Sequence, residues 1–156
     1  MSPNGNTHEN EEYKIVEKPS HPGKISELYT RIAWVYDIFT DHEITHHKKA
    51  IQMAGIKEDD LILEVACGTG RATVEIAKYL GEKGRLYAID LTEAMIKRAR
   101  AKLEKYNLIG KVELGIGDAR RLPFPDGMFD VLYNAYMFDL IELREIPGII
   151  SEFKRV

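Results

Sequence analysis

Four residues have the type and spacing to bind a polar small molecule. Gly68 and Gly70 form a glycine turn directly after the apolar run Leu61–Ala66. Such a turn lets backbone N–H groups approach a polar ligand with no Cβ in the way. Asp90 lies 20 residues after Gly70, and Asp118 follows a further apolar segment. Each carboxylate can accept hydrogen bonds from hydroxyl or amino groups, so the four residues predict a binding site for a polar small molecule.

The elements that position these residues alternate between strand and helix. Predicted strands cover Leu61–Ala66, Arg85–Leu91, Val112–Ile116 and Phe129–Ala135. Predicted helices cover Arg71–Leu80, the segment between Thr92 and Asn107, and Pro147–Val156. Strands that alternate with helices favour an α/β fold with a parallel, doubly wound sheet. Asp90 and Asp118 then end the second and third strands at the same edge of the sheet.

The chain divides into three segments by composition. Residues 1–20 are polar and lack apolar periodicity, so we expect disorder. Residues 21–57 have apolar side chains at helical spacing and predict an N-terminal helical cap. Residues 58–156 form the predicted Rossmann-like domain. His42, His46 and His47 suggest a metal site, but no carboxylate or cysteine completes it, so we expect histidines in solvent or in a substrate cleft.

Composition narrows the classes of partner. The net charge of -3, from 22 basic and 25 acidic residues without a long block of one sign, disfavours nucleic acid and anionic membranes. No apolar run reaches the roughly 20 residues that span a bilayer, and the first residues do not resemble a signal peptide. We therefore expect a cytoplasmic protein with a small-molecule partner. The single cysteine, Cys67, is expected to be a small buried side chain.

Three motifs in order carry a resemblance to a known family. They are LEVACGTG at residues 63–70, Asp90 after the second strand, and GDARRLPFPDGMFDVL at residues 117–132. Together they resemble class I S-adenosylmethionine-dependent methyltransferases, especially the group that includes ubiquinone and menaquinone C-methyltransferases. The resemblance extends from about Tyr29 to Val156. It implies a Rossmann-like methyltransferase fold, S-adenosylmethionine as cofactor, and methyl transfer to a small-molecule acceptor by direct in-line displacement.

The resemblance also implies a set of cofactor-binding residues. They are Tyr36, Glu64, Ala66, Gly68, Gly70, Asp90, Leu91, Asp118, Ala119 and Asn134. In such enzymes Glu64 would orient the glycine turn, Asp90 would bind the ribose, and Asp118 would bind the adenine. Leu91 and Ala119 would flank the adenine ring.

The resemblance and the sequence also give expectations for further positions. Gly68 and Gly70 would meet the methionine and ribose portions, and Ala66 stands where many members have glycine. Tyr36 would close over the cofactor. Aromatic residues of the N-terminal helix, Tyr29, Trp34 and Tyr36, are candidates to stabilise the sulfonium. The loop of residues 134–139 is expected to face the reacting methyl group. Arg120 and Arg121 are expected to face solvent, and no catalytic base is assigned.

The chain end gives a further expectation. Members of this family continue into three more strands, whereas this sequence ends at Val156, so we expect a sheet truncated after the fourth strand. The free edge of Phe129–Ala135 would then expose unpaired backbone groups, which predicts a homo-oligomer through that edge.

Two alternative functions remain open. The first is a truncated, non-catalytic module that binds the cofactor or associates with itself. The second is an NAD-dependent oxidoreductase domain, because glycine turns before a helix also bind dinucleotides. Thr73 at the third glycine position and Asp118 after the third strand disfavour the oxidoreductase.

Overall fold

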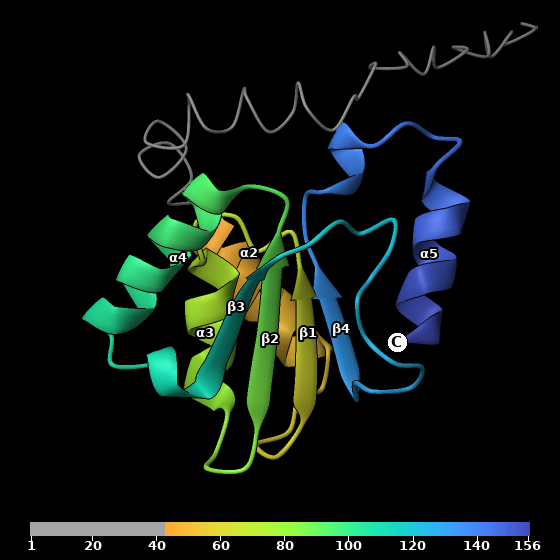
Figure 1. The fold of residues 1–156 in the computed structure, drawn as a ribbon. Helices are drawn as coiled ribbons and strands as arrows, with labels where there is room; N and C mark the ends of the chain where they lie inside the picture. Colours follow the sequence, from red (N-terminus) through yellow and green to blue (C-terminus); the bar gives the residue numbers. More distant parts are fainter. Residues whose placement is uncertain (1–42) are drawn as a thin grey trace, which may run out of the picture.

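The computed structural model describes residues 43–156, which form a parallel sheet with helices on both sides (Figure 1). The strands are β1 (Leu61–Val65), β2 (Arg85–Asp90), β3 (Val112–Ile116) and β4 (Val131–Asn134). The helices are α2 (Glu43–Met53), α3 (Arg71–Tyr79), α4 (Glu93–Lys105) and α5 (Ile146–Arg155), with short 3-10 helices at Ile109–Lys111 and Phe138–Leu140.

The strand order β3-β2-β1-β4 shows why a site forms above the centre of the sheet. The chain moves outward from β1 to β3 and then crosses back to place β4 on the other side of β1. Leu63 of β1 pairs in parallel with Tyr87 of β2 and with Leu132 of β4. Ligands of such sheets bind beyond the carboxyl ends of the strands, where the order reverses. Here that place lies above β1, and the predicted doubly wound parallel sheet is confirmed.

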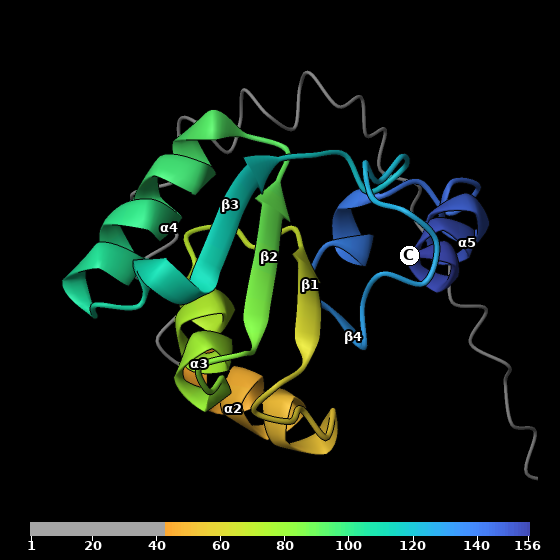
Figure 2. The same ribbon diagram turned by 60° about the horizontal axis from the view of Figure 1, so that its bottom comes forward.

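Two apolar cores explain why β1 reads as an almost continuous apolar run. Successive side chains of a strand point to opposite faces. Ile62 therefore packs into the core beneath α2, α3 and α4, and its neighbour Leu63 packs into the core beneath α5. Both side chains are fully buried. Figure 2 shows the first three helices gathered on one side of the sheet and α5 on the other.

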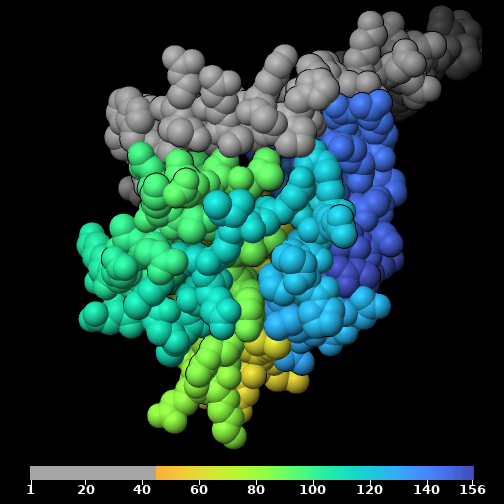
Figure 3. All heavy atoms as spheres, in the orientation of Figure 1, coloured from red at the N-terminus to blue at the C-terminus, as the bar shows by residue number. Residues whose placement is uncertain are grey.

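The segment between β3 and β4 completes the second core. Residues 117–130 cross the sheet on the α5 side, where Leu122 packs with Ile149 of α5. Figure 3 shows this segment, in cyan, spread over the front of the molecule. Its aromatic rings reinforce the packing, since Phe124 and Phe129 meet edge to face at 5.0 Å.

Several predicted strands and helices extend one or two residues beyond the observed ends. β1 ends at Val65, because Ala66 has a φ of 60° and so leaves the extended conformation. β2 ends at Asp90 rather than Leu91, and β4 covers only Val131–Asn134 of the predicted Phe129–Ala135. α3 ends at Tyr79, since Leu80 is extended. α5 covers Ile146–Arg155, and so begins and ends one residue before the predicted helix.

Most of the predicted N-terminal cap lies outside the described residues. This holds for residues 1–42, and therefore for Tyr29, Trp34, Tyr36 and His42. The described part of the cap is α2, which packs against α3. Within residues 43–156, β4 pairs only with β1, so it is an edge strand there, and self-association through it stays a prediction. No helix in this part of the chain is long and apolar enough to cross a membrane.

Candidate cofactor site

One pocket lies where the four strands end, and it gathers most of the described residues that the sequence predicted. Those in its lining are Glu64, Ala66, Gly68, Asp90, Leu91, Asp118 and Ala119. Gly70 and Asn134 are not in the lining. Asn134 instead donates a side-chain hydrogen bond to the carbonyl of Val65 at 2.8 Å, which ties β4 to the end of β1.

The two glycines of the turn are required for different reasons. Gly68 has a φ of 55° and Gly70 a φ of 81°, both in the left-handed region that favours glycine. A Cβ on Gly68 would meet nothing within 4 Å, because that position opens into the pocket. A Cβ on Gly70 would lie 2.9 Å from the Cα and Cβ of Ala99. Gly70 therefore lets α3 approach α4, whereas Gly68 keeps space for a ligand.

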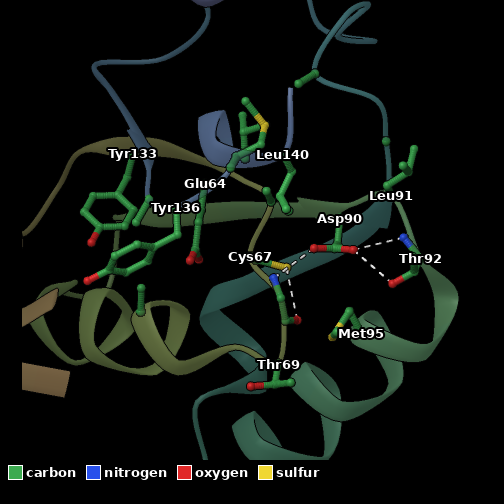
Figure 4. A pocket seen from close by; sticks show the side chains of 18 of the residues that line it. Glu64, Cys67, Thr69, Asp90, Leu91, Thr92, Met95, Tyr133, Tyr136 and Leu140 are labelled. Atoms are coloured by element: carbon green, nitrogen blue, oxygen red, sulfur yellow. Dashed lines mark hydrogen bonds between the residues drawn. The ribbon is translucent and has the colours of Figure 1, made fainter. Parts of the chain in front are cut away.

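Asp90 is the hydrogen-bond centre of the site (Figure 4). Its Oδ2 accepts from the backbone N–H of Gly68 at 2.9 Å, and its Oδ1 accepts from the N–H and the hydroxyl of Thr92 at 3.0 and 3.1 Å. Thr92 is the N-cap residue of α4, but its hydroxyl binds Asp90 instead of capping the helix. Burial raises the pKa of Asp90, and the N–H donors oppose that shift. The carboxylate thus joins β2, the glycine turn and the start of α4.

Glu64 is buried in the centre of the pocket, with an exposed fraction of 3%. Figure 4 shows its carboxyl group between Tyr136 and Cys67. Its Oε2 has no hydrogen-bond partner within the described residues. Burial, with a smaller contribution from the charge of Asp90, raises the pKa of Glu64 to about 8, and the side chain of Thr73 opposes that shift. The hydrogen bond that holds the glycine turn comes from Asp90, and Glu64 presents a protonated carboxyl group to the pocket at neutral pH.

Asp118 lies two residues beyond the end of β3 and is held by Arg120. Its Oδ1 accepts from the backbone N–H of Arg120 at 2.9 Å and from the guanidinium at 3.2 Å. The same guanidinium donates to both carboxylate oxygens of Glu145, at 2.9 and 3.0 Å. The expectation that Arg120 faces solvent is therefore wrong, because two carboxylates hold it in the pocket lining. Arg121 is exposed as expected.

At the other end of the pocket, sequence reasoning expected the loop of residues 134–139 and allowed histidines in a substrate cleft, but it missed the contact between them. There the buried His47 of α2 places its Nδ1 2.9 Å from the hydroxyl of Tyr133 in β4. The ring of Tyr136 meets the His47 ring edge-on at 5.7 Å. The two residues of the hydrogen bond are 86 positions apart, so no local pattern could reveal it. The signal that was available is the loop after the fourth strand, whose Ala135, Tyr136 and Met137 line the pocket.

Neither a metal centre nor a reactive thiol stands out in the described part of the chain. No group of three or more metal-ligating side chains occurs among residues 43–156. Cys67 is buried, as predicted, and burial raises its pKa well above the usual value. The pocket is thus a largely apolar cavity with a few placed polar groups.

The model of a methyltransferase domain matches residues 62–156, which include all of the sheet except Leu61 and most of the pocket. The chain belongs to the methyltransferase domain family. The resemblance to class I S-adenosylmethionine-dependent methyltransferases and the predicted Rossmann-like methyltransferase fold are therefore confirmed.

Curated relatives of this methyltransferase domain include quinone-pathway enzymes. It is 32% identical over 126 residues to the ubiquinone/menaquinone biosynthesis C-methyltransferase of Photorhabdus laumondii, covering 77% of this chain and 50% of that protein. It is 29% identical over 130 residues to the enzyme of the same name from Azotobacter vinelandii, covering 80% and 51%. The chain thus spans about half the length of the curated relatives it matches.

Solved structures confirm the fold of the methyltransferase domain. An S-adenosylmethionine-dependent methyltransferase from Aquifex aeolicus is 31% identical with a TM-score of 0.62, over 88% of this chain and 68% of that one. The [4+2]-cyclase SpnF has a TM-score of 0.74 at 16% identity, over 90% of this chain and 57% of that one. The second likeness shows the fold alone.

Proposed function

We propose that this chain binds S-adenosylmethionine and transfers its methyl group to a small-molecule acceptor. The observation that carries the proposal is the placement of Asp90, at the end of β2, and Asp118, just beyond β3, in one pocket. Family membership and the named activities of the relatives support the same reaction.

The described residues fit this cofactor. A carboxylate offers about four acceptor positions, and three hydrogen bonds to Asp90 leave capacity for a ribose hydroxyl. Gly68 leaves space beside it, because nothing lies where a Cβ would stand. Leu91 and Ala119 offer apolar surface for an adenine, next to Asp118 as acceptor for its amino group.

The methionine portion also has a suitable partner. The buried Oε2 of Glu64 lacks a hydrogen-bond partner in the described part of the chain, which is costly unless a ligand supplies a donor. The ammonium group of the cofactor is such a donor. The acceptors of the pocket are therefore suited to a nucleoside at one end and to an amino acid at its centre.

The sulfonium of the bound cofactor supplies an electrophilic methyl group, so the chain needs little acid or base chemistry to activate it. What the protein contributes is alignment of the acceptor and exclusion of water. Met137, with an exposed fraction of 8%, and Leu140 make the pocket wall beyond β4 apolar. We propose that the acceptor enters between this wall and Glu64, and that it is a small molecule rather than a polymer.

The test is transfer of labelled methyl from S-adenosylmethionine into the small-molecule fraction of a cell extract. The proposal expects label in a discrete small product with the native chain. An Asp90→Asn variant should lose most of the transfer, and the exposed Asp59→Asn should retain it. Label that appears only in protein or nucleic acid would contradict a small-molecule acceptor. Binding of S-adenosylhomocysteine without any transfer would favour a cofactor-binding module instead.

A further inference from the structure

The hydrogen bond between His47 and Tyr133 joins two polar side chains at one end of the pocket, whose lining also includes Arg71. His47 comes from α2 and Tyr133 from β4, and both line the cavity. The exposed fraction of each residue is 7%. Figure 4 shows the rings of Tyr133 and Tyr136 next to each other, with both hydroxyl groups pointing the same way. A buried pair of this kind needs a reason, because apolar residues would fill the space at lower cost.

The other titratable groups of the described pocket are poor proton acceptors at neutral pH. Glu64 holds its proton in the ligand-free chain, since its pKa is raised to about 8 by burial, and in the loaded chain it is engaged by the ammonium group of the cofactor. Burial raises the pKa of the Cys67 thiol as well. Asp90 is engaged with Gly68 and Thr92, and Asp118 is paired with Arg120.

His47 differs from all of these groups. Burial lowers its pKa, and the positive charges of Arg71 and His46 lower it further, while Glu75 opposes them. Its imidazole is therefore uncharged at neutral pH and able to take a proton. Tyr133 keeps its proton, because burial raises its pKa to about 12, and Glu64, which is ionised at the high pH where a tyrosine titrates, adds to that shift. In this pair, the protonated hydroxyl of Tyr133 can donate its hydrogen bond to the uncharged imidazole of His47.

We propose that Tyr133 and His47 form a relay that removes the proton of the methyl acceptor, an inference that rests on the proposed methyl transfer. The acceptor atom gives its proton to Oη of Tyr133 as the tyrosine proton moves to Nδ1 of His47. The electron pair of the broken bond stays on the acceptor atom and forms its bond to the methyl carbon. The pair of the old sulfur–carbon bond stays on sulfur, and the proton on His47 leaves to solvent.

This assignment defines the chemical class of the acceptor. It carries an acidic proton on its nucleophilic atom, as a hydroxyl or an activated C–H group does. Around it, the tyrosine rings, Ala135 and Met137 are uncharged, while Arg71 of the same lining carries a positive charge. Tyr133 is the catalytic residue, and His47 acts through it.

Two variants test the relay without removing the packing. Tyr133→Phe keeps the ring and removes the hydroxyl, and His47→Asn keeps a side-chain oxygen near the place of Nδ1 but removes the base. Each should lower the rate of labelled-methyl transfer into the extract about a hundredfold, a typical effect of a general base. The affinity for S-adenosylhomocysteine should change less than about threefold, because neither residue lies at the nucleoside end. The exposed Tyr79→Phe is a matched control that should retain the rate, and the exposed His46→Asn should retain it at neutral pH, where His47 stays uncharged.

The pH profile separates a relay from a structural role. The native rate should rise with pH through a midpoint below 6.5, as His47 loses its proton, and stay level while Tyr133 remains protonated. NMR titration of His47 in the chain loaded with S-adenosylhomocysteine should give the same midpoint. This rise should be absent in His47→Asn.

The outcomes are distinct. Native binding and transfer, with unchanged rates and profiles in both variants, would overturn the relay and leave the proposed function intact. A rate midpoint that differs from the His47 titration would also overturn it. Absence of S-adenosylhomocysteine binding, or of any transfer by the native chain, would remove the proposed function and the relay together.

Discussion

Oδ2 of Asp90 accepts a hydrogen bond from the backbone N–H of Gly68 at 2.9 Å, so the end of β2 fixes the glycine turn that follows β1. In Asp90→Asn, the side-chain amide must face one of the two N–H donors, Gly68 or Thr92. A hydrogen bond to a charged group contributes about 1.5–3 kcal/mol, so the affinity for S-adenosylhomocysteine should fall at least about tenfold. Calorimetric titration measures it, with Asp59→Asn as control. An unchanged affinity would show that Asp90 supports only the turn.

Substitution by alanine should affect the stability of the fold differently at Gly68 and at Gly70. Gly70→Ala places a Cβ 2.9 Å from Ala99 at a φ of 81°, and should destabilise the fold by about 2–5 kcal/mol. Gly68→Ala meets no atom and should cost only about 1–2 kcal/mol, as the left-handed Ala66 at the same turn indicates.

Urea denaturation and ligand titration distinguish the two glycines. Gly68→Ala should remain folded but bind S-adenosylhomocysteine at least about tenfold more weakly, because its new methyl group enters the pocket. Equal loss of stability in both variants would contradict the separate roles of the two glycines.

The pair of Arg120 with Glu145 is predicted to hold Asp118 in place. Arg120→Gln and Glu145→Gln should weaken S-adenosylhomocysteine binding about tenfold, because a carboxylate without its guanidinium partner is free to rotate. Both variants should also lower the ratio between the affinity for S-adenosylhomocysteine and the affinity for its analogue with a 6-oxo group in place of the adenine amino group. Arg144→Gln is the control, since that side chain is 81% exposed and pairs only with Glu142 among the described residues. A preserved preference in Arg120→Gln would rule out this positioning role.

Glu64 should make the stability of the chain depend on pH. Its pKa is raised from 4.5 to about 8 in the folded chain, so the folded state keeps a proton that the unfolded state loses. Its contribution to the free energy of unfolding is therefore full below about pH 4.5 and declines as the pH rises to about 8. The decline is at most about 5 kcal/mol.

The variant Glu64→Gln should lack this decline, because it resembles the protonated form at every pH. Denaturation at pH 5 and pH 8.5 should thus show the variant gaining stability over the native chain at the higher pH. The exposed Glu82→Gln should follow the native chain. Parallel curves for Glu64→Gln and the native chain would contradict a protonated Glu64.

The sequence predicted what depends on local pattern. The strand and helix order followed from apolar periodicity, and the pocket position of Gly68, Asp90 and Asp118 followed from their place after strands. The distinction between Gly68 and Gly70 did not, because it depends on Ala99 of α4, which packs against the turn in three dimensions. The hydrogen bond between His47 and Tyr133 and the ion pair of Arg120 with Glu145 likewise join segments far apart in the chain. Such contacts are fixed by the packing of α2 and α5.

The central claim is that the pocket above β1 binds the methyl-donor cofactor, and calorimetric titration with S-adenosylhomocysteine and, separately, with NAD tests it most directly. The account predicts one S-adenosylhomocysteine bound per chain, competition by S-adenosylmethionine, and no heat of binding with NAD. Binding of NAD alone, or of neither ligand to the folded chain, would contradict it.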